Sequence, residues 1–255
     1  MGGGTREIFA EEQTALLKRY YLDNKPRGDE DPLWSSHSDH SISPFVPCAS
    51  SRIPCVLRAC RLTPDDVLWD LGCGDGRLLH QAAAQYGCRT VGVDIDAVCI
   101  AEARQRAAEQ GVQSRCQFAC VDLTALQPGA LRPRAGAKLG SVDLGAAQLE
   151  EEEGEGAARG ALRAPTVLLI FITGHGLSRL SRFLHGEWAA GGLRIVTCVE
   201  SLATCFDYES ENPLFDQGDA AHEWLVYDAH EARGVYVVRP EIAAYLRSRR
   251  LLLVA

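Results

Sequence analysis

A glycine-rich turn with acidic residues on both sides is the part of this sequence best suited to bind a ligand. Asp70 and Asp75 flank the run Gly-Cys-Gly at 72–74. Glycines let a backbone approach a ligand where any β-carbon would clash. Two carboxylates beside the turn would repel a pyrophosphate group, whereas they would attract a cation. The turn therefore predicts a ligand that carries positive charge and has no phosphate.

A further acidic residue, Asp94, follows a β-type run shortly after the turn and is itself followed by Ile95. A carboxylate at this place accepts hydrogen bonds from both hydroxyls of a ribose. The spacing G-x-G-x-G departs from the dinucleotide pattern G-x-G-x-x-G, and the turn lacks the Gly-Lys-Ser/Thr ending of a P-loop. S-adenosylmethionine, which has an adenosine, an ammonium, a sulfonium and no phosphate, meets these requirements.

The glycine turn and Asp94 are expected to lie at the same edge of a sheet. An apolar strand begins at residue 67, a helix follows the turn, and a second strand covers 89–96. This is one βαβ unit, whose ligand is expected at the carboxyl ends of its strands. Apolar patterns predict further helices at 52–61, 97–110 and 177–184, and further strands at 116–121, 166–172, 193–199, 223–227 and 234–238.

Three motifs resemble the cofactor motifs of the class I S-adenosylmethionine-dependent methyltransferases. They are Asp-Leu-Gly-Cys-Gly-Asp-Gly-Arg at 70–77, Val-Gly-Val-Asp-Ile-Asp at 91–96 and Cys-Val-Asp-Leu at 120–123. The resemblance implies an α/β, Rossmann-like fold with a seven-stranded, mostly parallel sheet, helices on both faces and an antiparallel last strand. It also implies that Asp122 meets the adenine amino group, with a helix N-cap as the alternative.

The element Pro-Phe-Val-Pro at 44–47 precedes the glycine turn. It resembles the lead-in of the methyltransferases that modify the mitochondrial ATP synthase c-subunit, and of their prokaryotic relatives, which implies a place near the cofactor. Cys48 stands where that family usually has Thr, and the family's membrane-anchoring segment has no counterpart here. The predicted cofactor-binding residues are Phe45, Asp70, Gly72, Cys73, Gly74, Asp94, Ile95, Asp122 and Leu123.

Thr173 and His175 follow the fourth expected strand, where class I enzymes line the acceptor pocket, and they are the candidate catalytic residues. An amine acceptor must be neutral to attack a methyl group, and a histidine accepts a proton near neutral pH. The alternative for His175 is a loop histidine that shapes the turn between two glycines.

The resemblance makes protein lysine the leading acceptor. The Asn-Pro-Pro-Tyr tetrad of enzymes that methylate amide and base nitrogens is absent, which disfavours DNA adenine and glutamine. Small-molecule acceptors stay open, as does a non-catalytic scaffold that keeps the cofactor site. A nucleotide-dependent oxidoreductase on a related fold is a further alternative, against which the two carboxylates of the turn argue.

Composition limits the partners and the location. The chain has 255 residues and a net charge of −8, which disfavours general nucleic-acid binding. Ten cysteines without a C-x-x-C pair suggest reduced thiols. No metal site is predicted, because His37, Asp39 and His40 have no further matching ligands. No apolar run is long enough to span a membrane. A cytoplasmic or nuclear protein is expected, with mitochondria as an alternative.

The domain boundaries follow from the same patterns. Residues 1–47 are expected to hold an N-terminal helix, at 7–22, and the lead-in near the cofactor. Residues 48–255 are expected to form the methyltransferase domain. Within it, 128–165 is rich in Gly, Ala, Arg and Glu and contains a run of four glutamates at 150–153. Few large apolar residues occur there, so a mostly disordered surface insert is predicted.

Overall fold

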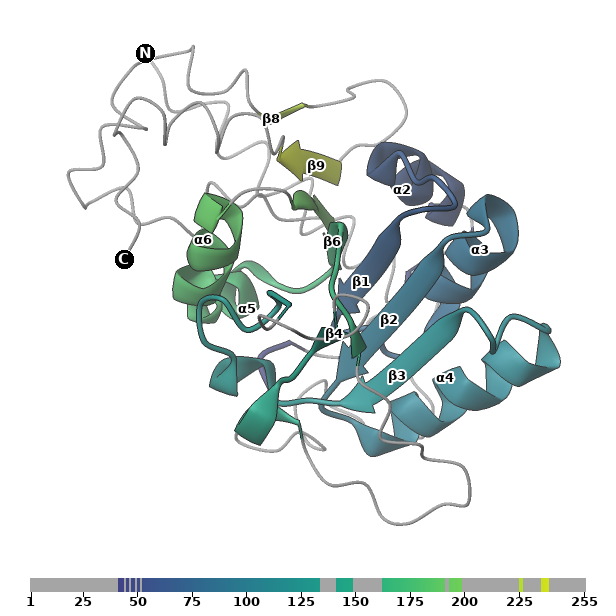
Figure 1. Ribbon diagram of the computed structural model, residues 1–255, viewed down its shortest axis with the longest axis horizontal. Helices are drawn as coiled ribbons and strands as arrows, with labels where there is room; N and C mark the ends of the chain where they lie inside the picture. Colours follow the sequence, from purple (N-terminus) through teal and green to yellow (C-terminus); the bar gives the residue numbers. More distant parts are fainter. Residues whose placement is uncertain are drawn as a thin grey trace.

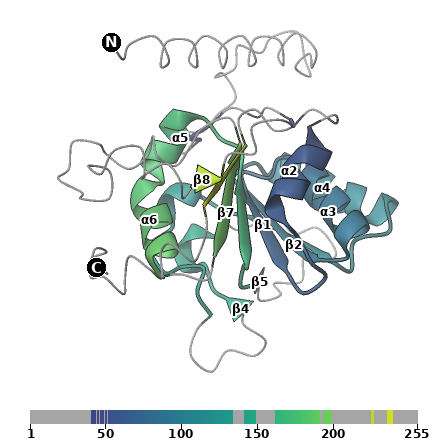
Figure 2. The same ribbon diagram turned by 90° about the horizontal axis from the view of Figure 1, so that it is seen from above.

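The protein is built as three layers, with one central sheet between two groups of helices. The computed structural model describes residues 41–43, 45, 47–48, 50, 52–133, 141–148, 162–190, 193–198, 225–226 and 235–238. Figure 1 shows the sheet with helices α2, α3 and α4 beside it. Figure 2, turned by 90°, shows that α5 and α6 cover the opposite face. The expected N-terminal helix at 7–22 lies outside the described residues.

The main sheet has the strand order β3-β2-β1-β6-β7-β9-β8. Neighbouring strands are parallel from β3 through β7, whereas β9 is antiparallel to both β7 and β8. The expected Rossmann-like arrangement with a mainly parallel sheet is confirmed. The strands are β1 (Val67–Leu71), β2 (Arg89–Asp94), β3 (Cys116–Cys120), β6 (Val167–Ile170), β7 (Arg194–Cys198), β8 (Leu225–Val226) and β9 (Val235–Val238).

The helices lie close to where the apolar patterns predicted them, with one difference after β6. The single helix expected at 177–184 is two helices, α5 (Gly174–Arg179) and α6 (Ser181–Ala190). The first of these begins directly after Thr173, whose side-chain oxygen accepts a hydrogen bond from the amide of Gly176 (3.2 Å). On the other face lie α2 (Ile53–Cys60), α3 (Arg77–Tyr86) and α4 (Ala97–Glu109).

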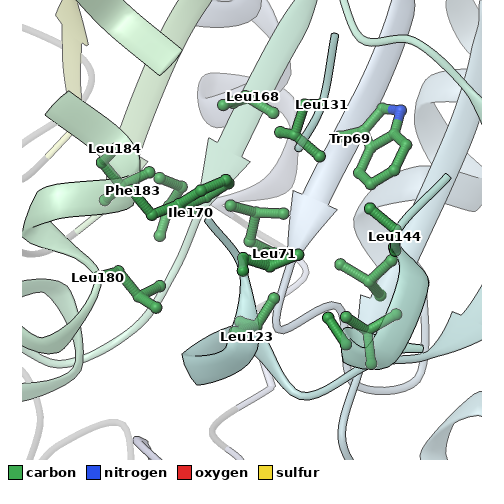
Figure 3. Close-up of a cluster of buried hydrophobic side chains, with 14 of the residues drawn as sticks. Trp69, Leu71, Leu123, Leu131, Leu144, Leu168, Ile170, Leu180, Phe183 and Leu184 are labelled. Carbon is green, nitrogen blue, oxygen red and sulfur yellow. The ribbon is translucent and has the colours of Figure 1, made fainter. Parts of the chain in front are cut away.

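Buried residues alternate between the two faces of the central strands. On β1, Leu68 belongs to the buried cluster that contains residues of α2, α3 and α4, whereas Trp69 belongs to the cluster that contains the α6 residues Phe183 and Leu184. The same alternation on β6 places its four residues in two clusters, and all four have no exposed surface. Figure 3 shows the cluster on the α5–α6 face. Burial on both faces is what the continuous apolar run of this strand predicts.

The described parts of the segment at 128–165, where a mostly disordered insert is predicted, include two short strands. Strands β4 (Ser141–Val142) and β5 (Leu162–Arg163) pair antiparallel. The indole N–H of Trp69 donates a hydrogen bond to the carbonyl of Arg163 (2.7 Å). A few well-spaced apolar side chains, Leu131, Val142, Leu144 and Leu162, are buried in the core cluster of Trp69. The remaining parts, 134–140 and 149–161, lie outside the described residues.

Candidate functional site

A cavity of about 480 Å³ opens at the carboxyl ends of β1, β2 and β6. This volume lies within the range of about 300–1,000 Å³ that small-molecule sites occupy. The wall contains eight of the nine predicted cofactor-binding residues. The lining residues are Ser41, Ile42, Ser43, Phe45, Pro47, Cys48, Asp70, Gly72, Cys73, Gly74, Asp75, Arg77, Leu78, Asp94, Ile95, Asp96, Ala97, Val98, Cys99, Leu123, Phe171 and Ile172.

The glycine turn after β1 is held against the end of β2 by its own backbone. The amides of Gly72 and Cys73 both donate to the carbonyl of Val93, at 2.8 and 3.1 Å. Gly72 and Gly74 have φ angles of +84° and +51°, a region that residues with a β-carbon rarely adopt. The pattern of glycines in the sequence therefore reflects both a backbone requirement and an open approach to the cavity.

Asp70, on β1, is a buried carboxylate that faces the cavity. Asp70 is 2% exposed, and its Oδ1 has no hydrogen-bond partner among the described residues. Burial raises the pKa of Asp70 well above its ordinary range, and the nearby charges of Asp94 and Asp75 raise it further. An ionised carboxylate here needs a partner, because a buried charge without one is costly. The site thus suits a ligand that brings a cation.

Asp75 does not share this role, which corrects the expectation that both acids of the turn face the ligand. Its carboxylate accepts hydrogen bonds from Nε and Nη2 of Arg77, at 3.0 and 2.6 Å, and also pairs with Arg106 of α4. Burial alone would raise the pKa of Asp75, but the hydrogen bonds and charges of the two arginines lower it. The negative charge of Asp75 is therefore compensated inside the protein.

Asp94, the last residue of β2, connects the turn to the next loop. Its Oδ2 accepts from the amide of Gly74 at 2.8 Å, and its Oδ1 accepts from the amide of Asp96 at 3.0 Å. Burial raises the pKa of Asp94, against the lowering effect of these two hydrogen bonds. Each carboxylate oxygen accepts more than one hydrogen bond, so both can also receive a ribose hydroxyl.

Six residues that precede the sheet in sequence form one side of the cavity, and we call them the cover: Ser41, Ile42, Ser43, Phe45, Pro47 and Cys48. The amide of Thr173 donates to Oγ of Ser43 at 3.2 Å, at the start of α5. At the other end, Nη1 of Arg77 donates to the carbonyl of Cys48 at 3.2 Å. The expected place of Phe45 near the glycine turn agrees with this arrangement. Pro44 and Val46 lie outside the described residues.

The far end of the cavity is apolar and is formed by residues after β2 and β3. Ile95 and Leu123 were expected there, whereas Val98 was missed. Val98 is 69% exposed although it is a large apolar residue, and Cys99 beside it is buried. The side chain of Asp96 accepts from the amide of Val98 (2.8 Å) and so begins α4 at this point. An exposed apolar residue in a cavity wall suits the flat face of an adenine.

Three predicted residues have other surroundings than expected. Asp122 does not line the cavity; its Oδ1 accepts from the amide and hydroxyl of Thr124, at 2.8 and 2.6 Å, which is the helix-capping alternative. Thr173 does not line it either, and its hydroxyl donates to the carbonyl of Ile42 (3.5 Å). His175 lies in α5 rather than in a loop, and its side chain is outside the described part of the structure.

No group of three or more His, Cys, Asp or Glu side chains in the described part of the chain is arranged to hold a metal ion. Within the same residues, none of the helices is long and apolar enough to cross a membrane.

Comparison with known proteins gives a match over the region that forms the cavity. Residues 68–150 match the family described as Methyltransferase domain. A protein-lysine N-methyltransferase from Saccharolobus islandicus is 36% identical over 76 residues, which are 29% of this chain and 47% of that protein. A histone-lysine N-methyltransferase, H3 lysine-79 specific, from Dictyostelium discoideum is 56% identical over 34 residues, 13% of this chain and 2% of that protein.

Among solved structures, this chain is similar to an RNA methyltransferase from Salinibacter ruber in complex with S-adenosyl-L-homocysteine. The identity is 23% and the TM-score 0.42, with 60% of this chain and 76% of that chain covered. The chain spans less than half the length of the two curated relatives. The residues that match the family include the glycine turn, Asp94 and Leu123, which line the cavity.

Proposed function

We propose that this protein is an S-adenosylmethionine-dependent methyltransferase that transfers a methyl group to a lysine side chain of a protein. The observation that carries the proposal is Asp70. This carboxylate is buried in the cavity wall, has no partner for Oδ1 among the described residues, and lies beside a glycine turn. A ligand with an ammonium group and no phosphate satisfies that carboxylate, whereas a dinucleotide does not.

Each part of the cavity has a role in this proposal. When bound, S-adenosylmethionine supplies a methyl group on a positively charged sulfur. Asp70 binds the ammonium, and Asp94 accepts the ribose hydroxyls while it holds the amide of Gly74. Ile95, Val98 and Leu123 form the apolar end for the adenine.

The protein's contribution to methyl transfer is positioning and removal of water. Alignment of an acceptor with the methyl group is worth several kcal/mol in reactions of this kind. The cover shields one side of the cavity, and a lysine brought there from water is more easily neutral, since burial disfavours its charged form. We propose His175, at the start of α5, as the group that receives the lysine proton.

Lysine as the acceptor is supported by two independent similarities. The Saccharolobus and Dictyostelium relatives are both named as lysine methyltransferases, and they match this chain over 76 and 34 residues. The lead-in element that contains Phe45 and Pro47 resembles that of the methyltransferases acting on the ATP synthase c-subunit. Its described residues line the cavity, as that resemblance implies.

The test is an activity assay with radiolabelled S-adenosylmethionine and a cell lysate. We expect label in protein, and methylated lysine after acid hydrolysis of the labelled bands. His175→Asn should reduce the rate of labelling and leave cofactor affinity unchanged. Label in the small-molecule fraction would identify a small-molecule methyltransferase instead. Cofactor binding without any transfer would support a non-catalytic scaffold, and stabilisation by NAD but not by S-adenosylmethionine would support an oxidoreductase.

A further inference from the structure

Arg77 contacts two different parts of the cavity wall at once. Its Nε lies 3.0 and 3.1 Å from the two carboxylate oxygens of Asp75, and its Nη2 lies 2.6 Å from Oδ2. Its remaining terminal nitrogen, Nη1, donates to the carbonyl of Cys48 at 3.2 Å. One guanidinium therefore connects the glycine turn, through Asp75, to the end of the cover.

The partner carboxylate fixes the direction of this guanidinium. Asp75 is 2% exposed, and Arg106 of α4 holds it from a second direction. Since Asp75 is anchored by Arg106, the planar fork of Arg77 is oriented before it meets the cover. Nη1 of Arg77 is therefore held in one direction, toward the carbonyl of Cys48. A flexible side chain without this support would not be fixed in this way.

The cover is hydrogen-bonded at both of its ends, and Thr173 also donates its hydroxyl to the carbonyl of Ile42. Ser43 is bound to Thr173 before α5, and Cys48 is bound to Arg77 at the start of α3. Phe45 lies between these attachments and is 48% exposed. Loss of the Arg77 contact removes a hydrogen bond at the end of the cover beside the glycine turn and leaves those to Thr173 in place.

We infer that Arg77 is a positioning residue that holds the cover closed over the cofactor through the carbonyl of Cys48. This inference rests on the proposed function, since it identifies the cavity as the cofactor site. In this inference, Arg77 contacts neither the methyl group nor the acceptor. Its effect is on how long the cofactor stays bound, because the cover must release before the ligand leaves.

The chain offers a closely matched control. Arg106 binds the same carboxylate as Arg77, and both side chains are 29% exposed. Arg106 does not line the cavity, whereas Arg77 does. Arg77→Lys and Arg106→Lys each keep a positive charge near Asp75, but a lysine ammonium does not reproduce the fork that spans Asp75 and Cys48.

The first measurement is the dissociation rate of S-adenosylmethionine from each full-length variant by stopped-flow displacement. Loss of one hydrogen bond from a charged donor predicts a rate about tenfold faster for Arg77→Lys than for Arg106→Lys. The melting temperatures of the two variants should differ little. Equal dissociation rates in the two variants would overturn the inference and leave the proposed function standing. Absence of cofactor binding by the unmodified protein would overturn both.

A second measurement needs no cofactor, so it tests the closure separately from the proposed function. Cys48 is 4% exposed, and burial raises the pKa of its thiol to about 11. Alkylation of Cys48 at pH 8, followed by peptide mass spectrometry, should be about tenfold faster in Arg77→Lys than in Arg106→Lys. Cys60 of α2, which has no exposed surface, serves as the internal standard. Equal alkylation of Cys48 in both variants would show that Arg77 does not hold the cover.

Discussion

The ring of Phe45 lies directly against the backbone of Gly74. A β-carbon placed on this glycine would be 2.2 Å from Cε2 of the ring and 2.8 Å from Cδ2. The same glycine donates its amide to Asp94. The cover, the turn and the acid after β2 therefore form one continuous wall, and a change at Gly74 affects all three.

Gly74→Ala should weaken S-adenosylmethionine binding. A residue with a β-carbon in this left-handed conformation costs about 1–2 kcal/mol, and the ring of Phe45 must also move. Calorimetric titration of Gly74→Ala, Phe45→Ala and the double variant measures the coupling. We expect Phe45→Ala to reduce cofactor affinity less in the Gly74→Ala variant than in the unmodified protein. Strictly additive losses would mean that the ring and the turn act independently.

Asp70→Asn should stabilise the empty protein while it weakens cofactor binding. The raised pKa of Asp70 means that folding favours its neutral form, so its contribution to stability is present below about pH 4 and is lost as pH rises through the folded pKa. The free energy of unfolding of Asp70→Asn, relative to the unmodified protein, should therefore increase between pH 5 and pH 8. Urea titrations should give a difference of about 1 kcal/mol at pH 8, which corresponds to about 2–4 °C in melting temperature. A destabilised variant at pH 8 would show that the ionised carboxylate is well accommodated without a ligand.

Cofactor binding should also release a proton from Asp70. A cation beside a carboxylate lowers its pKa, whereas burial raises that pKa in the empty cavity. Titration calorimetry in buffers of different ionisation enthalpy measures this release, and Asp70→Asn should abolish it. S-adenosylhomocysteine, which keeps the ammonium, should release a similar amount, whereas adenosine should release little.

Asp94→Ala should reduce cofactor affinity by about 1–3 kcal/mol, because a charged acceptor for the ribose hydroxyls is lost. Asp96→Ala is the matched control, since it removes a carboxylate two residues away that caps α4 through the amide of Val98. Asp96→Ala should lower the melting temperature, but it should reduce cofactor affinity by less than Asp94→Ala does. Similar affinity losses in both variants would place the ribose contact elsewhere.

Leu144→Ala should destabilise the fold by about 2–5 kcal/mol, as expected for a large apolar side chain removed from a packed core. Leu144 lies in the segment that composition alone marks as an insert (Figure 3). Val98→Ala, at a site that is 69% exposed, should change the free energy of unfolding by less than about 0.5 kcal/mol. If Leu144→Ala lowers the free energy of unfolding by less than about 0.5 kcal/mol, the segment adds little to the core.

The site was predictable where local pattern decides the structure. Glycines with positive φ at 72 and 74 and the acid after β2 follow from short-range requirements, and their places agree with the structure. Asp75 was misjudged because its second partner, Arg106, comes 31 residues later, on a helix whose packing no local pattern reveals.

The buried residues in the segment after β3 could not be predicted, for a related reason. Its apolar residues are few, and a low average hydrophobicity hides them, although Leu131 and Leu144 are almost fully buried. Thr173, a candidate catalytic residue from its place after a strand, hydrogen-bonds to Ile42 of the cover and to the amide of Gly176 in α5. A position at the carboxyl edge of a sheet is therefore not sufficient for a place in the cavity wall.

The attachment of Ser43 to Thr173 joins residues that are 130 positions apart in sequence. On the ribosome, the cover is synthesised before the sheet, and the support at Thr173 follows only after β6. The βαβ unit that carries the glycine turn can form earlier, because its contacts are local. The cavity wall beside the turn and Asp94 is therefore complete only after α5 has been synthesised, because its first part is bound to Thr173.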